Sequence, residues 1–118
     1  MLNVVIYPKC STCRDAVKWF DNHNIAITTR DIVNEKLSAS EIKDIHTKSG
    51  LPIKKFFNTS GMKYRELGLK DKMDHLSTEA LYELLASDGM LVKRPLVHAQ
   101  DGRVTLGFKI NEYEKMWK

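Results

Sequence analysis

The sequence has few residues of the kinds that crosslink or interrupt a chain: two cysteines, three prolines and six glycines in 118 residues. Two cysteines exclude a disulfide-stapled scaffold, and a chain of this length can bury a hydrophobic core without crosslinks. There is no repetitive or biased tract, and 42% of the residues are hydrophobic, which excludes a disordered chain. No apolar run approaches the roughly 18 residues that a membrane span requires. A single globular domain over residues 1–118, without a membrane segment, is therefore expected.

The sequence also lacks a strong excess of charge, a secretory leader and a paired histidine motif. Its 19 basic and 15 acidic residues give a net charge of +4, and the two signs are interleaved. This pattern is typical of a solvated surface, so direct binding of nucleic acid is not expected. The absence of a basic, apolar and cleavable N-terminal segment favours a cytoplasmic protein. The four histidines are dispersed, so neither a zinc site nor another cofactor is expected.

The two cysteines stand in a Cys-x-x-Cys motif between a predicted strand and a predicted helix. Residues 2–7 form a short run rich in Val and Ile that ends at Pro8, which favours a strand. From Ser11 onward the apolar residues follow the spacing of one helix face: they are Cys13, Ala16, Val17 and Phe20. The motif is therefore placed at the start of a helix.

This placement predicts different roles for the two thiols. Cys10 precedes the helix, where unpaired N–H groups and the positive end of the dipole stabilise a thiolate. Lys9 and Arg14 add positive charge, so Cys10 is the predicted nucleophile. Cys13 points inward and is predicted to stay protonated until it resolves a mixed disulfide. An exposed attacking thiol beside a buried resolving thiol is typical of a thiol–disulfide oxidoreductase, the alternative being two unreactive cysteines.

The first half of the remaining sequence predicts one more strand and then only helices. Alternation over residues 25–32 indicates a second strand, which a strand–helix–strand unit places parallel to the first. The site then lies at the carboxyl edge of the sheet, where open α/β sheets have their sites. Residues 34–88 predict a helical insertion, whose first helix begins with a capping box formed by Ser38 and Glu41.

The last third of the sequence predicts a return to the sheet. Residues 96–99 and 103–108 flank the dipeptide Asp101-Gly102, which between apolar runs is a strong hairpin signal. Asn111 is predicted to cap a final helix. The aromatic residues Tyr7, Trp19 and Trp117 are interpreted as core residues.

This order of elements resembles the thioredoxin-fold family that joins ArsC-type arsenate reductases to Spx-type regulators. The resemblance spans nearly the whole chain, and its carriers are YPKCSTCR (7–14), FFNTSG (56–61), YRELGL (64–69), LVKRP (91–95) and GF (107–108). It implies an α/β, thioredoxin-like fold of the glutaredoxin type, with a sheet ordered 2-1-3-4 and a helical insertion. It also implies that a cis peptide bond precedes Pro95 and that Arg94 lies near Cys10, where it stabilises an anion or a thiolate.

The sequence departs from the family members that reduce arsenate with glutathione and glutaredoxin, which use one cysteine and three arginines. Only Arg94 matches: Asn58 stands at the second position and Gly107-Phe108 near the third, with Lys109 as the nearest cation. The loss of two guanidiniums removes the bidentate donors that hold a tetrahedral oxyanion. The second cysteine is instead similar to the Spx branch, in which a Cys-x-x-Cys is a redox switch.

Three functions remain open at this point. The first is a cytoplasmic thiol–disulfide oxidoreductase that cycles Cys10 and Cys13 between dithiol and disulfide, with thioredoxin, glutaredoxin or glutathione as reductant. The second is an Spx-like regulator that binds the RNA polymerase α-subunit, a contact that would fall near Gly50. The third is an arsenate reductase in which Cys13 serves as an internal resolving thiol. A monomer is expected in each case.

Overall fold

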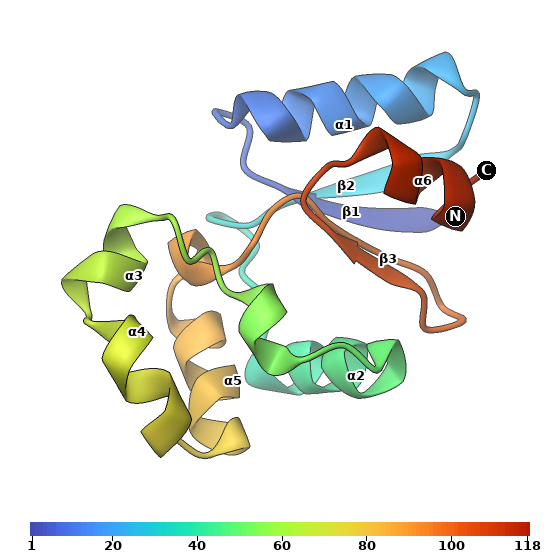
Figure 1. The fold of residues 1–118 in the computed structure, drawn as a ribbon. Coiled ribbons are helices and arrows are strands. Elements are labelled where there is room, and N and C mark those ends of the chain that lie inside the picture. Colours follow the sequence, from blue (N-terminus) through green and yellow to red (C-terminus); the bar gives the residue numbers. More distant parts are fainter.

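A four-stranded mixed sheet ordered β2-β1-β3-β4 forms the centre of the protein. The structure, a computed structural model, describes all of residues 1–118, and its strands are β1 (Leu2–Ile6), β2 (Ile27–Asp31), β3 (Leu96–His98) and β4 (Val104–Leu106). β1 and β2 run parallel, whereas β3 pairs antiparallel with both β1 and β4 (Figure 1). The predicted α/β class and the strand order 2-1-3-4 are confirmed.

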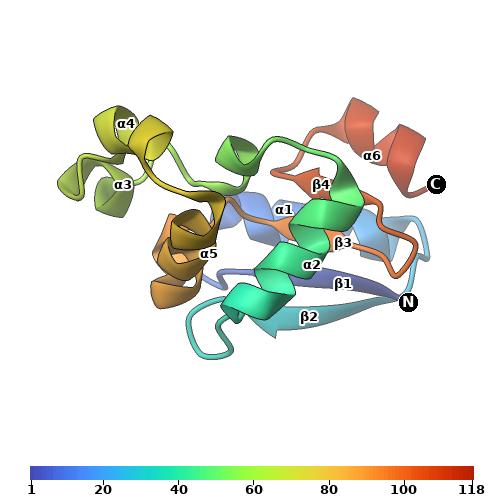
Figure 2. The same cartoon turned by 90° about the horizontal axis from the view of Figure 1, so that it is seen from below.

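Helices cover both faces of the sheet. α1 (Ser11–Asn22) and α6 (Ile110–Met116) lie on one face, and α2 (Ala39–Ser49) lies on the other (Figures 1 and 2). The chain between α2 and β3 continues the helical layer and extends it past one end of the sheet. Its elements are the 3-10 turn η1 (Ile53–Phe56), α3 (Met62–Glu66), α4 (Leu69–Lys72), the turn η2 (Met73–His75), α5 (Thr78–Ser87) and the turn η3 (Gly89–Leu91).

Local sequence signals account for the ends of α2. The Ser38 hydroxyl accepts a hydrogen bond from the Glu41 amide at 3.1 Å, and the Glu41 carboxylate accepts one from the Ser38 amide at 3.0 Å. This reciprocal pair is the predicted capping box. Gly50 ends the helix with φ +70°, a left-handed conformation that glycine adopts without steric cost.

The predicted cap of the last helix is wrong. α6 begins after Lys109, and Asn111 lies exposed within its first turn. The helix starts two residues early because the Tyr113 amide donates to the Lys109 carbonyl at 3.0 Å, while the Tyr113 hydroxyl donates to the Gly107 carbonyl. The packing of Tyr113 thus sets the start of the helix, and no capping side chain does so. The short helices α3 and α4 also carry no cap signal that would have delimited them.

Two hydrophobic cores lie on opposite sides of the sheet. Val4 of β1 points into a core built with α1 and α6 that includes Phe20 and Tyr113. Its neighbour Val5 points into a larger core shared with the helical insertion, because successive side chains of a strand face opposite sides. Full burial of a side chain such as Phe20 stabilises the fold by roughly 1.5–3 kcal/mol. This packing fixes α1 on the sheet, and the first turn of α1 carries the dithiol.

No helix of the protein combines the length and the apolar character needed to cross a bilayer.

Candidate redox site

Cys10 occupies the N-cap position of α1, directly after the turn that follows β1. Its amide donates to the Tyr7 carbonyl at 2.9 Å, and its carbonyl accepts from the Arg14 amide at 3.1 Å. These two bonds hold the backbone of Cys10 in place while its side chain stays partly exposed. The geometric cap is not closed by a side-chain hydrogen bond, and Cys10 forms no disulfide.

Cys13 lies one helical turn later and is completely buried. Its Sγ accepts a hydrogen bond from the Tyr7 amide, with a nitrogen–sulfur distance of 3.5 Å. Both cysteines are free thiols and lie close to one another. The predicted inward direction of Cys13 is confirmed, and the pair combines an accessible sulfur with an enclosed one.

The surroundings lower the pKa of the Cys10 thiol. Desolvation raises this pKa and is the largest single influence, but it is outweighed by the amides of Cys13 and Thr12, the Cys13 thiol and the Arg94 guanidinium. All four stabilise the thiolate, as expected where free amides begin a helix.

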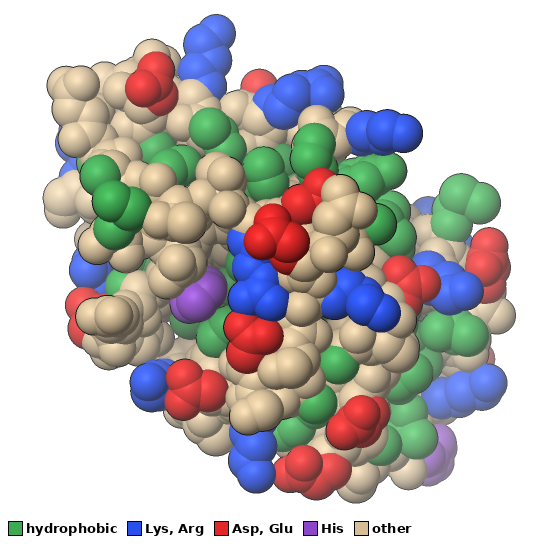
Figure 3. All heavy atoms as spheres, turned by 180° about the vertical axis from the view of Figure 1, so that it is seen from behind, with side chains coloured by type: hydrophobic (Ala, Val, Ile, Leu, Met, Phe, Trp, Pro, Cys, Tyr) green, Lys and Arg blue, Asp and Glu red, His purple; other side chains and the backbone are tan.

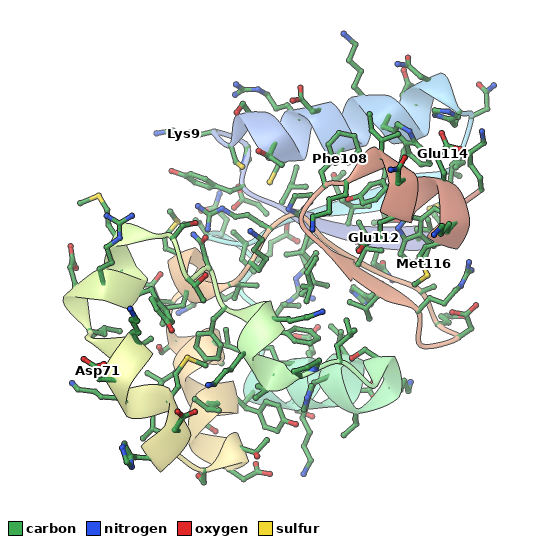
Figure 4. All side chains as sticks on the ribbon, in the orientation of Figure 1. Lys9, Asp71, Phe108, Glu112, Glu114 and Met116 are labelled. Carbon is green, nitrogen blue, oxygen red and sulfur yellow. The ribbon has the colours of Figure 1, made fainter.

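The charge that acts on Cys10 comes from Arg94 instead of the expected cations beside it in the sequence. Arg14 is exposed and donates to the Pro8 carbonyl at 3.3 Å. Lys9 points away from the body of the protein (Figure 4). A tertiary contact therefore supplies the positive charge near the dithiol.

The pKa of the Cys13 thiol is shifted in the opposite direction to that of Cys10. Burial raises the pKa of Cys13 to about 12, the Tyr7 amide and Arg94 oppose this effect, and the nearby Cys10 sulfur adds to it. Of the two thiols, Cys10 is therefore the one that ionises first as the pH rises. Once Cys10 is bonded to another sulfur, its hydrogen bond and its charge no longer hold the proton on Cys13, so the second thiol becomes easier to ionise.

Arg94 is held beside the dithiol by several weak contacts. Its guanidinium carbon lies 5.2 Å from the centroid of the Tyr7 ring, and its Nη1 donates to the carbonyls of Met90 at 3.4 Å and Val92 at 3.3 Å. Its Nε is buried without a hydrogen-bond partner. The Arg94–Pro95 peptide bond is cis.

Asn58 and Gly107-Phe108 stand at the two other positions where the resemblance expects arginine. Both are hydrogen-bonded to the segment that carries Arg94. The Asn58 amide donates to the Leu91 carbonyl at 2.7 Å, and the Gly107 amide donates to the Pro95 carbonyl at 2.9 Å. Phe108 packs edge-on against Tyr113, with ring centroids 4.8 Å apart. Lys109, the nearest cation, lines a groove beside β4 that contains neither cysteine. Arg94 is therefore the cation that acts on the dithiol.

Tyr7 has a larger part in the site than its interpretation as a core aromatic implied. It is half-buried, its amide contacts Cys13 and its ring contacts Arg94. Trp19 and Trp117 are buried, as predicted. The signal for Tyr7 was its place in the motif YPKCSTCR, three residues before Cys10. No three His, Cys, Asp or Glu side chains come together in a way that could hold a metal ion.

Sheet order 2-1-3-4, a dithiol at the first helix start and a cis proline segment beside it define a thioredoxin-like protein. The ArsC family matches residues 5–116, and the chain belongs to the ArsC family. It is 54% identical to the uncharacterized protein YusI of Bacillus subtilis over 94% of this chain and 93% of that protein. It is 28% identical to global transcriptional regulator Spx 1 of Oceanobacillus iheyensis, over 98% and 86% of the two chains.

A solved structure with clear sequence identity has the same fold. The crystal structure of a possible arsenate reductase from Streptococcus mutans aligns with a TM-score of 0.86 and 44% identity, over 97% of this chain and 98% of that one. The resemblance read from the sequence is thereby confirmed at the level of family and fold.

Proposed function

We propose that this protein is a thiol–disulfide oxidoreductase in which Cys10 attacks and Cys13 resolves. The observation that carries the proposal is the opposite shift of the two pKa values: that of Cys10 is lowered at a helix start, and that of Cys13 is raised by burial. An accessible thiolate beside a protonated resolving thiol is the arrangement that favours thiol–disulfide exchange.

The reaction proceeds in two exchanges. The Cys10 thiolate attacks one sulfur of a substrate disulfide, forms a mixed disulfide and expels the other substrate sulfur as a thiolate. Cys13 then loses its proton to solvent or to the departing thiolate and attacks Cys10 Sγ. This closes the Cys10–Cys13 disulfide and releases the second substrate thiolate. Two electrons pass from the protein to the substrate, and a dithiol of the thioredoxin or glutaredoxin kind, or glutathione, returns them.

Trapping of the mixed disulfide tests this assignment. The Cys13→Ser variant is incubated with a small disulfide peptide, and the products are identified by intact mass. It is expected to accumulate one peptide on Cys10, whereas the wild type closes the Cys10–Cys13 disulfide and retains no peptide, and the Cys10→Ser variant gains none. A mixed disulfide on Cys13 in the Cys10→Ser variant, formed at the same rate, would reverse the roles. No exchange in any variant would reject the oxidoreductase.

A second candidate function, a redox-switched regulator, is favoured by the match to Spx 1 over almost the whole chain. The contact with the RNA polymerase α-subunit would lie near Gly50, which is exposed at the end of α2 and has no atom within 4 Å of the place of a Cβ. The open space around Gly50 is compatible with a docking surface.

Binding of the isolated RNA polymerase α-subunit distinguishes the two functions. A regulator of this kind is expected to bind the α-subunit and to lose that binding in Gly50→Arg. Gly68→Arg is the matched control, because Gly68 has a similar φ of +63° and lies far from α2 in sequence. Absence of binding by the reduced and by the oxidised protein would leave the oxidoreductase as the function.

A further inference from the structure

A groove of about 550 Å³ lies beside β4, away from the two cysteines. It is lined by residues around η1, by Lys93 before the Arg94–Pro95 bond, by β4, and by Lys109 and α6. Glu112 and Met116 of α6, which line it, are labelled in Figure 4. The apolar part of the lining includes Leu51, Phe57 and Leu106.

The lining of this groove is strongly basic. Lys54, Lys55, Lys93 and Lys109 all contribute to it, against the single carboxylate of Glu112. Lys54 is paired with Asp74 at 2.7 Å, whereas the other three lysines have no carboxylate within ion-pair distance. The opposite face of the protein, in contrast, mixes acidic and basic side chains (Figure 3). Three unpaired cations around one groove favour an anionic occupant.

The main chain of β4 adds hydrogen-bonding groups to the groove. β4 is an edge strand, and Ala99 and Pro95 pair through their backbones with residues 103 and 107 of the opposite strand segment. Because hydrogen-bonded pairs alternate in an antiparallel ladder, Thr105 bonds to Val97, and the N–H and C=O groups of Val104 and Leu106 point away from β3. These groups face the side on which another strand can add.

Lysines near an edge strand can also serve to block unwanted pairing. Blocking lysines stand on the edge strand itself or close its free side, but β4 reads Val104-Thr105-Leu106 and has no charge. The lysines stand on the segments around the strand, and β4 itself lines the groove together with them. Cations placed around an uncharged strand would not repel an acidic strand that adds there.

We propose that this groove binds an extended acidic segment of a partner protein, which adds as a fifth strand beside β4. Backbone hydrogen bonds to Val104 and Leu106 would hold the segment, and its carboxylates would lie against Lys55, Lys93 and Lys109. Apolar side chains of the segment would rest on Leu51 and Leu106, which line the groove and are only partly buried. Strand addition to an exposed sheet edge is a recurrent mode of peptide recognition.

The probe for this site is an eight-residue, fluorescein-labelled peptide of alternating glutamate and valine, followed by fluorescence anisotropy at low salt. The double variant Lys55→Glu with Lys109→Glu is expected to bind it about tenfold more weakly than the wild type. Lys18→Glu with Lys36→Glu is the matched control, because both lysines are exposed and unpaired and the change in net charge is the same. Cys10→Ser is expected to bind normally, which separates this proposal from the redox function.

Two further arms test the strand itself. A peptide N-methylated at alternate residues, which cannot complete a ladder, is expected to bind at least about tenfold more weakly. Amide chemical shifts of the unmodified protein should change at Val104 and Leu106 on addition of the probe. Equal losses in the two double variants, undiminished binding of the N-methylated peptide, or shifts confined to another surface would overturn the proposal. Tighter binding of an oligothymidylate than of the peptide would overturn it as well.

Discussion

The guanidinium of Arg94 lies over the ring of Tyr7, with its Cζ 5.2 Å from the ring centroid. The amide of the same tyrosine donates to Cys13, so Tyr7 contacts both the cation and the buried thiol of the site. Arg94 has no carboxylate partner within ion-pair distance. Its charge therefore remains available to the dithiol, on which it acts by lowering the pKa of Cys10.

Arg94→Ala should make the reduction potential of the Cys10–Cys13 pair more negative. Arg94 stabilises the thiolate and hence the reduced form, so its loss favours the disulfide. The expected shift is about 10–30 mV at neutral pH, where 30 mV corresponds to about 1.4 kcal/mol. Equilibration against a glutathione series, read by mass after alkylation, measures it. Arg14→Ala is the control, since Arg14 is exposed and bonded to Pro8; a larger shift in that variant would contradict the coupling to Arg94.

Cys10 should be alkylated before Cys13, and its rate should reach half its maximum below the free-cysteine pKa of about 8.5. Because the Cys13 thiol helps to lower the pKa of Cys10, Cys13→Ala should raise that midpoint, whereas Cys13→Ser keeps a donor and should raise it less. Rates of iodoacetamide labelling against pH give the midpoints. Modification of Cys13 first in the wild type would show that the roles are reversed.

The protein should be a poor arsenate reductase. Asn58 and the segment Gly107-Phe108 stand where arsenate-reducing members have arginine, and each missing charge-assisted contact should cost roughly 1.5–3 kcal/mol of oxyanion binding. Arsenate-dependent oxidation of NADPH, coupled through either glutaredoxin or thioredoxin, should stay near the background. Asn58→Arg restores one guanidinium and serves as the comparison. Turnover by the wild type at rates normal for an enzyme would disprove this prediction.

Glu41→Gln should destabilise the fold at neutral pH by about 0.5–1 kcal/mol, the range for a partly exposed ion pair. The carboxylate pairs bidentately with Arg30, at 2.6 and 3.1 Å, and this pairing lowers the pKa of Glu41 to about 2. The glutamine carbonyl can keep the capping box, while the substitution removes the charge and one of the two oxygens that accept from Arg30. A carboxyl whose pKa is lowered on folding stabilises the protein above its unfolded pKa of about 4.5.

The difference between wild type and Glu41→Gln should therefore disappear as the pH falls from about 4.5 toward 2. Urea denaturation at a series of pH values measures it. A constant difference across that range would mean that the variant acts through packing and not through the lost charge.

Short-range patterns were enough to predict the elements that form the site. Apolar spacing placed Cys13 on the inner face of α1, the capping box placed the start of α2, and Asp101-Gly102 placed the hairpin of β3 and β4. These features depend on residues within a few positions of one another, so they can be read without knowledge of the fold. The same reasoning failed for α6, where the packing of Tyr113 decided the start of the helix.

The sequence by itself determined the dithiol, its place at a helix start and the family to which the chain belongs, because these depend on adjacent residues and on motifs spread along the chain. Only the tertiary structure decided which cation acts on Cys10, since Arg94 reaches the site through the packing of two distant segments. The tertiary structure also brings three unpaired lysines from separate segments to the groove beside β4, an edge strand of the sheet. Electrostatic effects depend on distance in space, and distance between remote residues is set by the fold.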